Sequence, residues 1–397
     1  MLLGVHLDLE PVGELTVVGE AVEFRLLETY RARYPRRVLG QVFEDDVSRV
    51  HRSRVKLPPF FSNLLPEGAL RELVARQIGV KAERESYLLA QLGDDLPGAT
   101  RVVVLDPTDE DDTREIEGRQ DEPSDLLKFS LAGVQLKFSA VHASDRGMTI
   151  PAHGRGGDWI VKLPDPRFPG VPENEWSMMT LARHIGLDVA EVQIVPLASI
   201  EGLPGEVRAY PSSMGLAIRR FDRVAGKRVH MEDFAQVHDV RPRHWDKYHS
   251  ANFETIARIV ASVAPGSVEE LVRRLVFNAA IGNGDAHIKN WSLLYPDGVS
   301  AVLSPAYDLV STIQYLPDDD LGLNLARSKR FEDVGLTSFQ RLAEKAQLNV
   351  PIDSVVGGTV ARIREGWAEL RSSMPMSDEE KAKIDAHFAR VPVMQGA

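Results

Sequence analysis

The sequence predicts an α+β fold in which strand-rich segments precede a mainly helical part. Strand-like segments fill the first 105 residues and return between residues 128 and 221, where short apolar runs are bounded by turn residues. From Met231 onward, apolar residues recur at helical spacing. The chain has 397 residues, which suffices for two or three domains or for one large body.

Residues 1–105 are predicted to form a small α+β subdomain. Strands are expected at 4–9, 14–18 and 22–27, and a helix is expected to begin near Pro66. The next segment, residues 106–125, contains ten carboxylates and two arginines, so it contributes −8 to the net charge of −11. Runs of like charge with few apolar residues usually stay solvated. We therefore predict that this segment is a linker rather than an interaction tail.

Two larger parts follow the linker. Residues 126–225 are predicted to form a β-rich lobe, with strands at 128–136, 159–163, 190–197 and 215–221 and a helix at 174–185. Residues 226–397 are predicted to form an all-helical lobe, because apolar spacing indicates helices at 252–263, 267–281 and 356–370. The predicted fold is thus α+β, with two lobes and an additional N-terminal subdomain.

The composition excludes several classes of function. The chain contains no cysteine, which rules out disulfides, thiolate metal sites and cysteine nucleophiles. The net charge of −11 disfavours a protein that binds nucleic acid through bulk positive charge, so any contact with DNA is expected to be local or through a partner. No apolar stretch approaches the ~20 residues that a bilayer requires. We expect a cytoplasmic protein without membrane contact.

The strongest chemical pattern is the segment 284–290, with the sequence GDAHIKN. It places Asp285 and Asn290 five residues apart in a loop directly after a predicted helix. Phosphoryl transfer to a hydroxyl requires a carboxylate that orients and deprotonates the acceptor and an amide oxygen that holds Mg²⁺, and the protein kinase catalytic loop has this spacing. The sequence therefore predicts a phosphotransferase active site here.

Two further residues follow the order of a two-lobed kinase. Asp308 comes after a strand–turn–strand passage at 291–303, where kinases place their metal-binding aspartate. Lys162 ends an apolar strand, and Glu173 and Glu175 open the next helix. A strand lysine paired with a helix glutamate is the kinase arrangement that holds the nucleotide phosphates. Taken singly, Asp308 also fits a helix cap, and a lysine such as Lys162 is more often an exposed charge at a strand end. Their order favours the kinase interpretation.

The segment 130–137, SLAGVQLK, offers small residues at a turn, where backbone N–H groups can approach a phosphate. This pattern is weak by itself, because it is neither a Walker A nor a GxGxxG motif. His287 lacks a second histidine or cysteine at ligand spacing. We interpret it as a residue that organises the loop or lies beside the nucleotide.

Together these segments resemble the HipA family, the kinase toxins of bacterial HipBA toxin–antitoxin modules. The resemblance spans nearly the whole chain and includes FSNLLPE at 61–67, GDDLPGA at 93–99, SLAGVQLK at 130–137, VKLP at 161–164, RFDR at 220–223, GDAHIKN at 284–290 and PAYDL at 305–309. It implies a two-lobed, kinase-like body preceded by a small N-terminal subdomain.

The resemblance also implies a role for each matching residue. Asp285 is the expected catalytic residue, Asn290 and Asp308 are the expected Mg²⁺ ligands, and Ser130 is the expected site of autophosphorylation. The residues expected to bind ATP are Ala132, Gly133, Val134, Gln135, Lys137, Lys162, Arg219, Arg220, Phe221, His287, Lys289, Asn290, Tyr307 and Asp308.

The function that the resemblance implies is an ATP- and Mg²⁺-dependent serine/threonine protein kinase that arrests growth as a toxin. Its implied target is an aminoacyl-tRNA synthetase, and glutamyl-tRNA synthetase is the first candidate. Its implied partner is a HipB-like helix-turn-helix antitoxin, with operator DNA reached only through the antitoxin complex.

Two other functions remain open at this point. The chain is alternatively a weakly catalytic corepressor that binds the antitoxin and strengthens its hold on DNA. A small-molecule kinase is the third interpretation, since the same residues can phosphorylate lipids, sugars or antibiotics.

Overall fold

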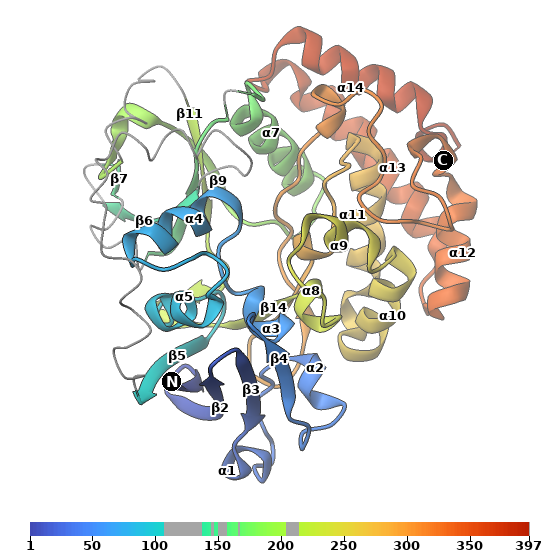
Figure 1. The fold of residues 1–397 in the computed structure, drawn as a ribbon. Helices are drawn as coiled ribbons and strands as arrows, with labels where there is room; N and C mark the ends of the chain where they lie inside the picture. Colours follow the sequence, from blue (N-terminus) through green and yellow to red (C-terminus); the bar gives the residue numbers. More distant parts are fainter. Residues whose placement is uncertain (107–136, 144–146, 150–156, 166, 204–213, 397) are drawn as a thin grey trace.

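The computed structural model describes residues 1–106, 137–143, 147–149, 157–165, 167–203 and 214–396. In Figure 1 the N-terminal subdomain lies below a β-rich lobe and beside a helical lobe. The linker predicted at 106–125 and the strand predicted at 128–136 lie outside the described residues, except for Asp106.

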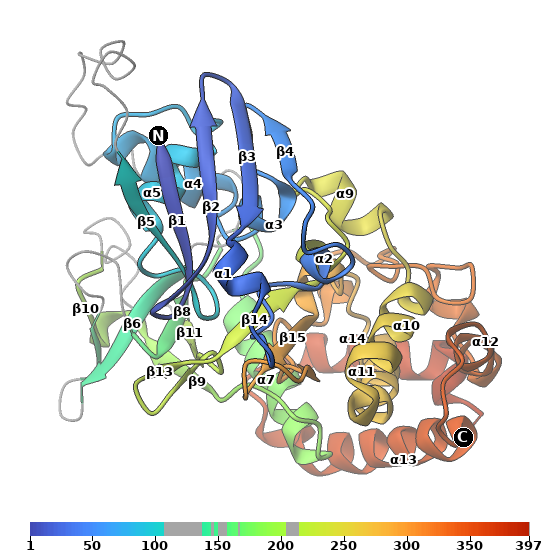
Figure 2. The same cartoon turned by 90° about the horizontal axis from the view of Figure 1, so that it is seen from below.

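The N-terminal subdomain is built on a five-stranded antiparallel sheet in the order β4-β3-β2-β1-β5, seen in Figure 2. Its strands are β1 (Leu2–Leu7), β2 (Glu10–Val18), β3 (Ala21–Leu26), β4 (His51–Arg54) and β5 (Thr100–Asp106), and its helices are α1 (Glu28–Arg31), α2 (Gln41–Glu44), α3 (Pro59–Ser62), α4 (Gly68–Gln77) and α5 (Glu85–Leu92). Phe24, Phe43 and Phe61 are fully buried and pack edge to face or tilted against one another. This part of the chain therefore has an apolar core of its own.

The β-rich lobe contains a six-stranded sheet in the order β10-β7-β6-β8-β11-β9. Its elements are β6 (Lys137–Ala143), β7 (Gly147–Thr149), β8 (Trp159–Lys162), α7 (Val171–His184), β9 (Val192–Pro196), β10 (Ile200–Glu201) and β11 (Met214–Arg219). Pro172 lies in the first turn of α7, where the missing N–H costs nothing. The helix ends before Gly186, whose φ of +79° suits a residue without a side chain. The helix predicted at 174–185 and the strands predicted at 159–163, 190–197 and 215–221 are observed within a few residues of their expected positions.

The C-terminal lobe is organised around the buried helix α11. Its helices are α8 (Phe234–Val237), α9 (His244–His249), α10 (Phe253–Val263), α11 (Val268–Ile281), α12 (Leu336–Ala346), α13 (Ile352–Leu370) and α14 (Asp378–Arg390). Leu271, Val276, Phe277 and Ile281 of α11 are fully buried. The neighbours α10, α13 and α14 pack against this helix, as Figure 2 shows. Among the described residues, none of the helices has the length and apolar composition that crossing a bilayer requires.

The prediction of an all-helical C-terminal lobe is wrong in one respect. The strands β14 (His230–Asp233), β15 (Ser292–Tyr295) and β16 (Val302–Leu303) form a small antiparallel sheet. The passage expected at 291–303 supplies β15 and β16, whereas β14 was missed because it has four residues, three of them charged or titratable. Pairing with β15 stabilises this polar strand, and no local pattern predicts that pairing.

The N-terminal subdomain is joined to this small sheet by buried polar contacts. The N–H of Gln41 donates to both carboxylate oxygens of Glu232, at 3.0 and 3.2 Å. The hydroxyl of Tyr295 donates to the same carboxylate at 2.5 Å. Burial raises the pKa of Glu232 to about 8, because a charged carboxylate is costly away from water.

This buried carboxyl makes stability depend on pH. The folded chain keeps the Glu232 proton up to about pH 8, whereas the unfolded chain loses it near the ordinary pKa of 4.5. The folded state therefore binds more protons in that interval, and the free energy of unfolding should fall as the pH rises from about 5 to 8. Each unit of raised pKa corresponds to about 1.4 kcal/mol.

Urea unfolding at several pH values tests this prediction. In Glu232→Gln, the free energy of unfolding should fall less steeply with rising pH than in wild type. An equal slope in wild type and variant would contradict the assignment, and the exposed Glu83→Gln is the control.

Candidate active site

A buried ion pair links the sheet and helix of the β-rich lobe. The Nζ of Lys162, at the end of β8, donates to the two carboxylate oxygens of Glu175 on α7 at 2.6 and 2.8 Å. Of the two glutamates considered from the sequence, Glu175 is the partner, because its side chain is buried toward β8 while that of Glu173 is partly exposed. Lys162 also forms an ion pair with Asp308. The strand lysine, the helix glutamate and the aspartate of the other lobe thus meet at one point.

This cluster has more negative than positive charge. Burial raises the pKa of Glu175 to about 7, with the Asp308 carboxylate adding to the rise and Lys162 opposing it. Burial acts to lower the pKa of Lys162, but Asp308 and Glu175 together raise it above its usual value. One ammonium therefore serves two carboxylates. The Asp308 side chain remains 29% exposed and offers a place for a second cation.

The loop with Asp285 is fixed by its own asparagines. The side-chain oxygen of Asn283 accepts from the N–H of Asp285 at 3.0 Å, and its amide donates to Asn278 at 2.7 Å. The amide nitrogen of Asn290 donates to the carbonyl oxygen of Asp285 at 2.7 Å. This hydrogen bond joins the two ends of the loop. The Asp285 carboxylate itself is half exposed and accepts a hydrogen bond from the hydroxyl of Tyr248 on α9.

Asn290, Tyr307 and Asp308 line one cavity, whose described lining residues all belong to the C-terminal lobe. The hydroxyl of Tyr307 donates to the carbonyl oxygen of Lys289 at 2.8 Å and lies 2.6 Å from the hydroxyl of Ser292. These contacts hold the segment of Asp308 against the loop. Asp308 has a φ of +55°, a left-handed conformation that aspartate and asparagine adopt more readily than most residues.

The donor set of this cavity suits Mg²⁺. Carboxylate and amide oxygens are the protein ligands that Mg²⁺ prefers, and the ion usually takes one or two of them together with substrate phosphates and water. Asp308 and Asn290 provide such oxygens, and the Asn290 amide is oriented by its bond to Asp285. Among the described residues, no group of three or more histidine, aspartate or glutamate side chains forms a site for a metal ion by itself. Two protein oxygens of this kind are compatible with Mg²⁺ bound together with phosphate oxygens.

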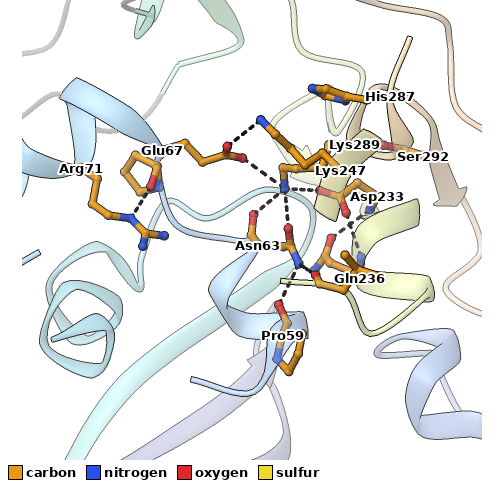
Figure 3. Close-up of polar contacts among 12 residues, drawn as sticks. Pro59, Asn63, Glu67, Arg71, Asp233, Gln236, Lys247, His287, Lys289 and Ser292 are labelled. Carbon is orange, nitrogen blue, oxygen red and sulfur yellow. Dashed lines mark hydrogen bonds and ion pairs between the residues drawn. The ribbon is translucent and has the colours of Figure 1, made fainter. Parts of the chain in front are cut away.

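His287 and Lys289 have different surroundings, although both lie in the predicted loop. His287 is buried, its Nε2 lies 3.9 Å from the Asp285 carboxylate, and burial lowers its pKa. Its ring packs edge to face on Tyr248, with 5.1 Å between the ring centroids. Lys289 extends instead to Asp233, at 2.6 Å, and to Asn63 of the N-terminal subdomain, at 2.8 Å, as Figure 3 shows. Its side chain is thus engaged outside the cavity.

The segment of Arg219, Arg220 and Phe221, which is expected to bind ATP, also contacts the N-terminal subdomain. The Arg220 guanidinium pairs with Asp222 at 2.9 Å and with Asp95 at 3.3 Å, so this side chain is used in a buried ion-pair network. Arg219 pairs with Glu191 at the surface, at 3.2 Å. Phe221 lies against Tyr307, with 5.7 Å between the ring centroids. Of the three, Phe221 is the one in ring contact with a residue of the cavity wall.

The predicted phosphate-binding loop is only partly described. Ser130, Ala132, Gly133, Val134 and Gln135 lie outside the described residues. Lys137 opens β6, where its Cα is in register with that of Lys162. Tyr248 and Asn63 were not predicted as site residues; they lie far from the loop in sequence, and no spacing pattern links them to it.

A strand lysine, its helix glutamate, a catalytic-loop aspartate and asparagine, and a following aspartate define a protein of the kinase class. Comparison with known proteins agrees. The sequence model of one protein family, the HipA N-terminal domain, matches residues 3–103. The sequence model of a second family, the HipA-like C-terminal domain, matches residues 129–367. The chain belongs to the HipA family of kinase toxins.

Sequence similarity to named proteins extends over most of the chain. "Putative kinase Y4dM" of Sinorhizobium fredii is 43% identical over 98% of this chain and 97% of its own length. "Serine/threonine-protein kinase toxin HipA" of Shewanella oneidensis is 25% identical over 83% of this chain and 80% of its own. A solved structure of the HipA, HipB and operator DNA complex from Shewanella oneidensis contains a chain with 19% identity and a TM-score of 0.73, covering 99% of this chain and 96% of that one. The two-lobed, kinase-like α+β fold is therefore confirmed.

Proposed function

We propose that the chain is an ATP- and Mg²⁺-dependent serine/threonine protein kinase that acts as the toxin of a toxin–antitoxin module. The observation that carries this proposal is the meeting of Lys162, Glu175 and Asp308 beside the loop of Asp285 and Asn290. Lys162 would bind the nucleotide phosphates while Glu175 holds its side chain in place. Asp285 would orient the acceptor hydroxyl and take its proton.

Asp308 and Asn290 are the residues that would hold Mg²⁺ in this cavity. Bound there with ATP, the ion would neutralise charge on the phosphate oxygens. The chain's own part is to fix the two oxygens through the Asn290–Asp285 bond and the Tyr307–Lys289 bond, at 2.7 and 2.8 Å. Such preorganisation removes the cost of ordering these groups during the reaction.

We propose that the partner is a helix-turn-helix antitoxin of the HipB type in the cytoplasm. The solved relative was determined in complex with HipB and operator DNA. The net charge of −11 favours contact with DNA through such a partner over direct binding. By family analogy the phosphorylated target is an aminoacyl-tRNA synthetase, with glutamyl-tRNA synthetase as the first candidate.

The proposed function is tested by incubating the protein with labelled ATP and a cytoplasmic extract. Wild-type protein should label a discrete protein, identified by mass spectrometry, only when Mg²⁺ is present. Asp285→Asn should label nothing. If wild type labels no protein but still strengthens operator binding by its antitoxin, the corepressor function replaces the kinase function.

Ser130 is the expected site of autophosphorylation. A phosphate there adds about −1.5 to −2 charges to a segment that precedes the strand of Lys137, and a loop over ATP phosphates cannot easily hold that charge. We expect phosphorylation of Ser130 to switch the enzyme off. Mass spectrometry should find the phosphate in wild type and not in Asp285→Asn. Its absence from both proteins would refute the prediction.

A further inference from the structure

The side chain of Lys289 connects the loop of Asp285 to two other parts of the chain (Figure 3). Its Nζ lies 2.6 Å from the Asp233 carboxylate, 2.8 Å from the side-chain oxygen of Asn63 and 3.7 Å from the carboxylate of Glu67. Asn63 and Glu67 belong to the N-terminal subdomain, more than 200 residues earlier in the chain. The lysine is largely buried, so these contacts are shielded from water and salt.

Asn63 presents its oxygen to Lys289 from a fixed position. It follows α3 directly, is 6% exposed, and its amide nitrogen donates to the carbonyl oxygens of Pro59 at 2.9 Å and Val240 at 2.7 Å. With both donors used, the amide cannot rotate without losing hydrogen bonds. The side-chain oxygen is thereby directed at Lys289.

Asp233 is held as firmly on the opposite side. One of its carboxylate oxygens caps α8 by accepting from the N–H of Gln236 at 2.9 Å, and the other binds Lys289. The amide of Gln236 in turn donates to the carbonyl oxygen of Phe60 at 3.2 Å. Lys289 is therefore bound between two rigid acceptors, one from each side of the subdomain junction.

Lys289 is one residue from Asn290 and four from Asp285. Its carbonyl oxygen accepts from Tyr307, the neighbour of Asp308, and Asn290 is bonded to the carbonyl of Asp285. A shift of Lys289 would thus move the expected metal ligand and the expected catalytic carboxylate together. Small displacements of such groups are costly, since a misplacement of about 1 Å can reduce a rate by ~10²-fold.

Glu67 also contacts a second lysine, which lies near the carboxylate of Asp285. It pairs with Lys247 of α9 at 2.9 Å, and the next residue, Tyr248, is the one that donates to Asp285. The N-terminal subdomain therefore contacts the loop from one side and α9 from the other. No other role in the proposed reaction uses Asn63 or Glu67.

We propose that Asn63 is a positioning residue for phosphoryl transfer, which the N-terminal subdomain supplies to the catalytic loop through Lys289. This inference rests on the proposed kinase function. The N-terminal subdomain would then help to hold the active-site loop in place, in addition to any role in partner binding.

The experiment compares Asn63→Ala, Lys289→Met and their double variant. Asn63→Ala should lower kcat by roughly ten- to a hundredfold with little change in the KM for ATP. Because Asn63 acts through Lys289, the double variant should lose no more than Lys289→Met alone. Gln41→Ala is the matched control: it removes a 2.9 Å hydrogen bond to Tyr295 at the same subdomain junction without contacting the loop, and should keep the wild-type kcat.

A second measurement does not need activity. Hydrogen exchange followed by mass spectrometry should show faster exchange in the peptide that contains residues 284–291 of Asn63→Ala, and unchanged exchange there in Gln41→Ala. Unchanged exchange in Asn63→Ala, or a kcat equal to that of active wild type, overturns the inference. If wild type transfers no phosphate, the proposed function fails, and the exchange data alone decide whether Asn63 holds the loop.

Discussion

Replacing Asp285 with asparagine is expected to lower kcat for phosphoryl transfer by about 10²- to 10⁴-fold, the usual cost of losing a positioned base. ATP binding should remain close to that of wild type. The carboxylate is half exposed at the edge of the loop, whereas the nucleotide is expected to bind Lys162 and Asp308. The loop should keep its shape in the variant, because its hydrogen bonds to Asn283 and Asn290 use the Asp285 backbone.

The measurement is transfer of labelled phosphate to a protein substrate, together with calorimetry of ATP binding. Asp318→Asn is a suitable control, since Asp318 is an exposed aspartate of the same lobe and follows the segment of Asp308 in the chain. It should retain wild-type kcat. Wild-type turnover in Asp285→Asn would refute the assignment, and a parallel loss of ATP affinity would show that the loop has collapsed.

The sequence predicted the part of the site that depends on local spacing. Asp285, Asn290 and Asp308 lie in two short segments after α11, and their order, with the strand lysine and helix glutamate before them, predicted a kinase. Lys162 was predicted from its place at a strand end, and the structure pairs it with Glu175. These residues could be proposed from the sequence because kinase chemistry requires particular residue types at particular separations.

The contacts of the N-terminal subdomain could not be predicted in this way. The expectation that Lys289 and Arg220 bind ATP stays a prediction, and no sequence pattern indicated that their side chains contact Asn63 and Asp95. These partners lie more than 100 residues away in sequence and come close only when the subdomain packs on the rest of the chain. Hydrogen bonds and ion pairs of this kind leave no periodic pattern, because each depends on tertiary packing. The short strand β14 was missed for the same reason.

Asp308→Asn is expected to remove most of the gain in ATP affinity that Mg²⁺ provides. The substitution takes away a carboxylate charge next to the expected metal position, while Lys162 remains paired with Glu175. Asparagine is the appropriate replacement because Asp308 has a φ of +55°, which alanine adopts less readily. The folded structure should therefore persist.

Calorimetry with ATP in Mg²⁺ and in a chelator is the measurement for this prediction. Wild type should bind ATP more tightly with Mg²⁺, and Asp308→Asn should bind it about equally in both solutions, because the phosphate charge is then poorly neutralised. Asn290→Ala should show the same effect, since it removes the second oxygen of the cavity. Asp318→Asn should behave as wild type. If both Asp308→Asn and Asn290→Ala keep the wild-type dependence on Mg²⁺, the metal is held by other residues, and the kinase site must be reassigned around Lys162.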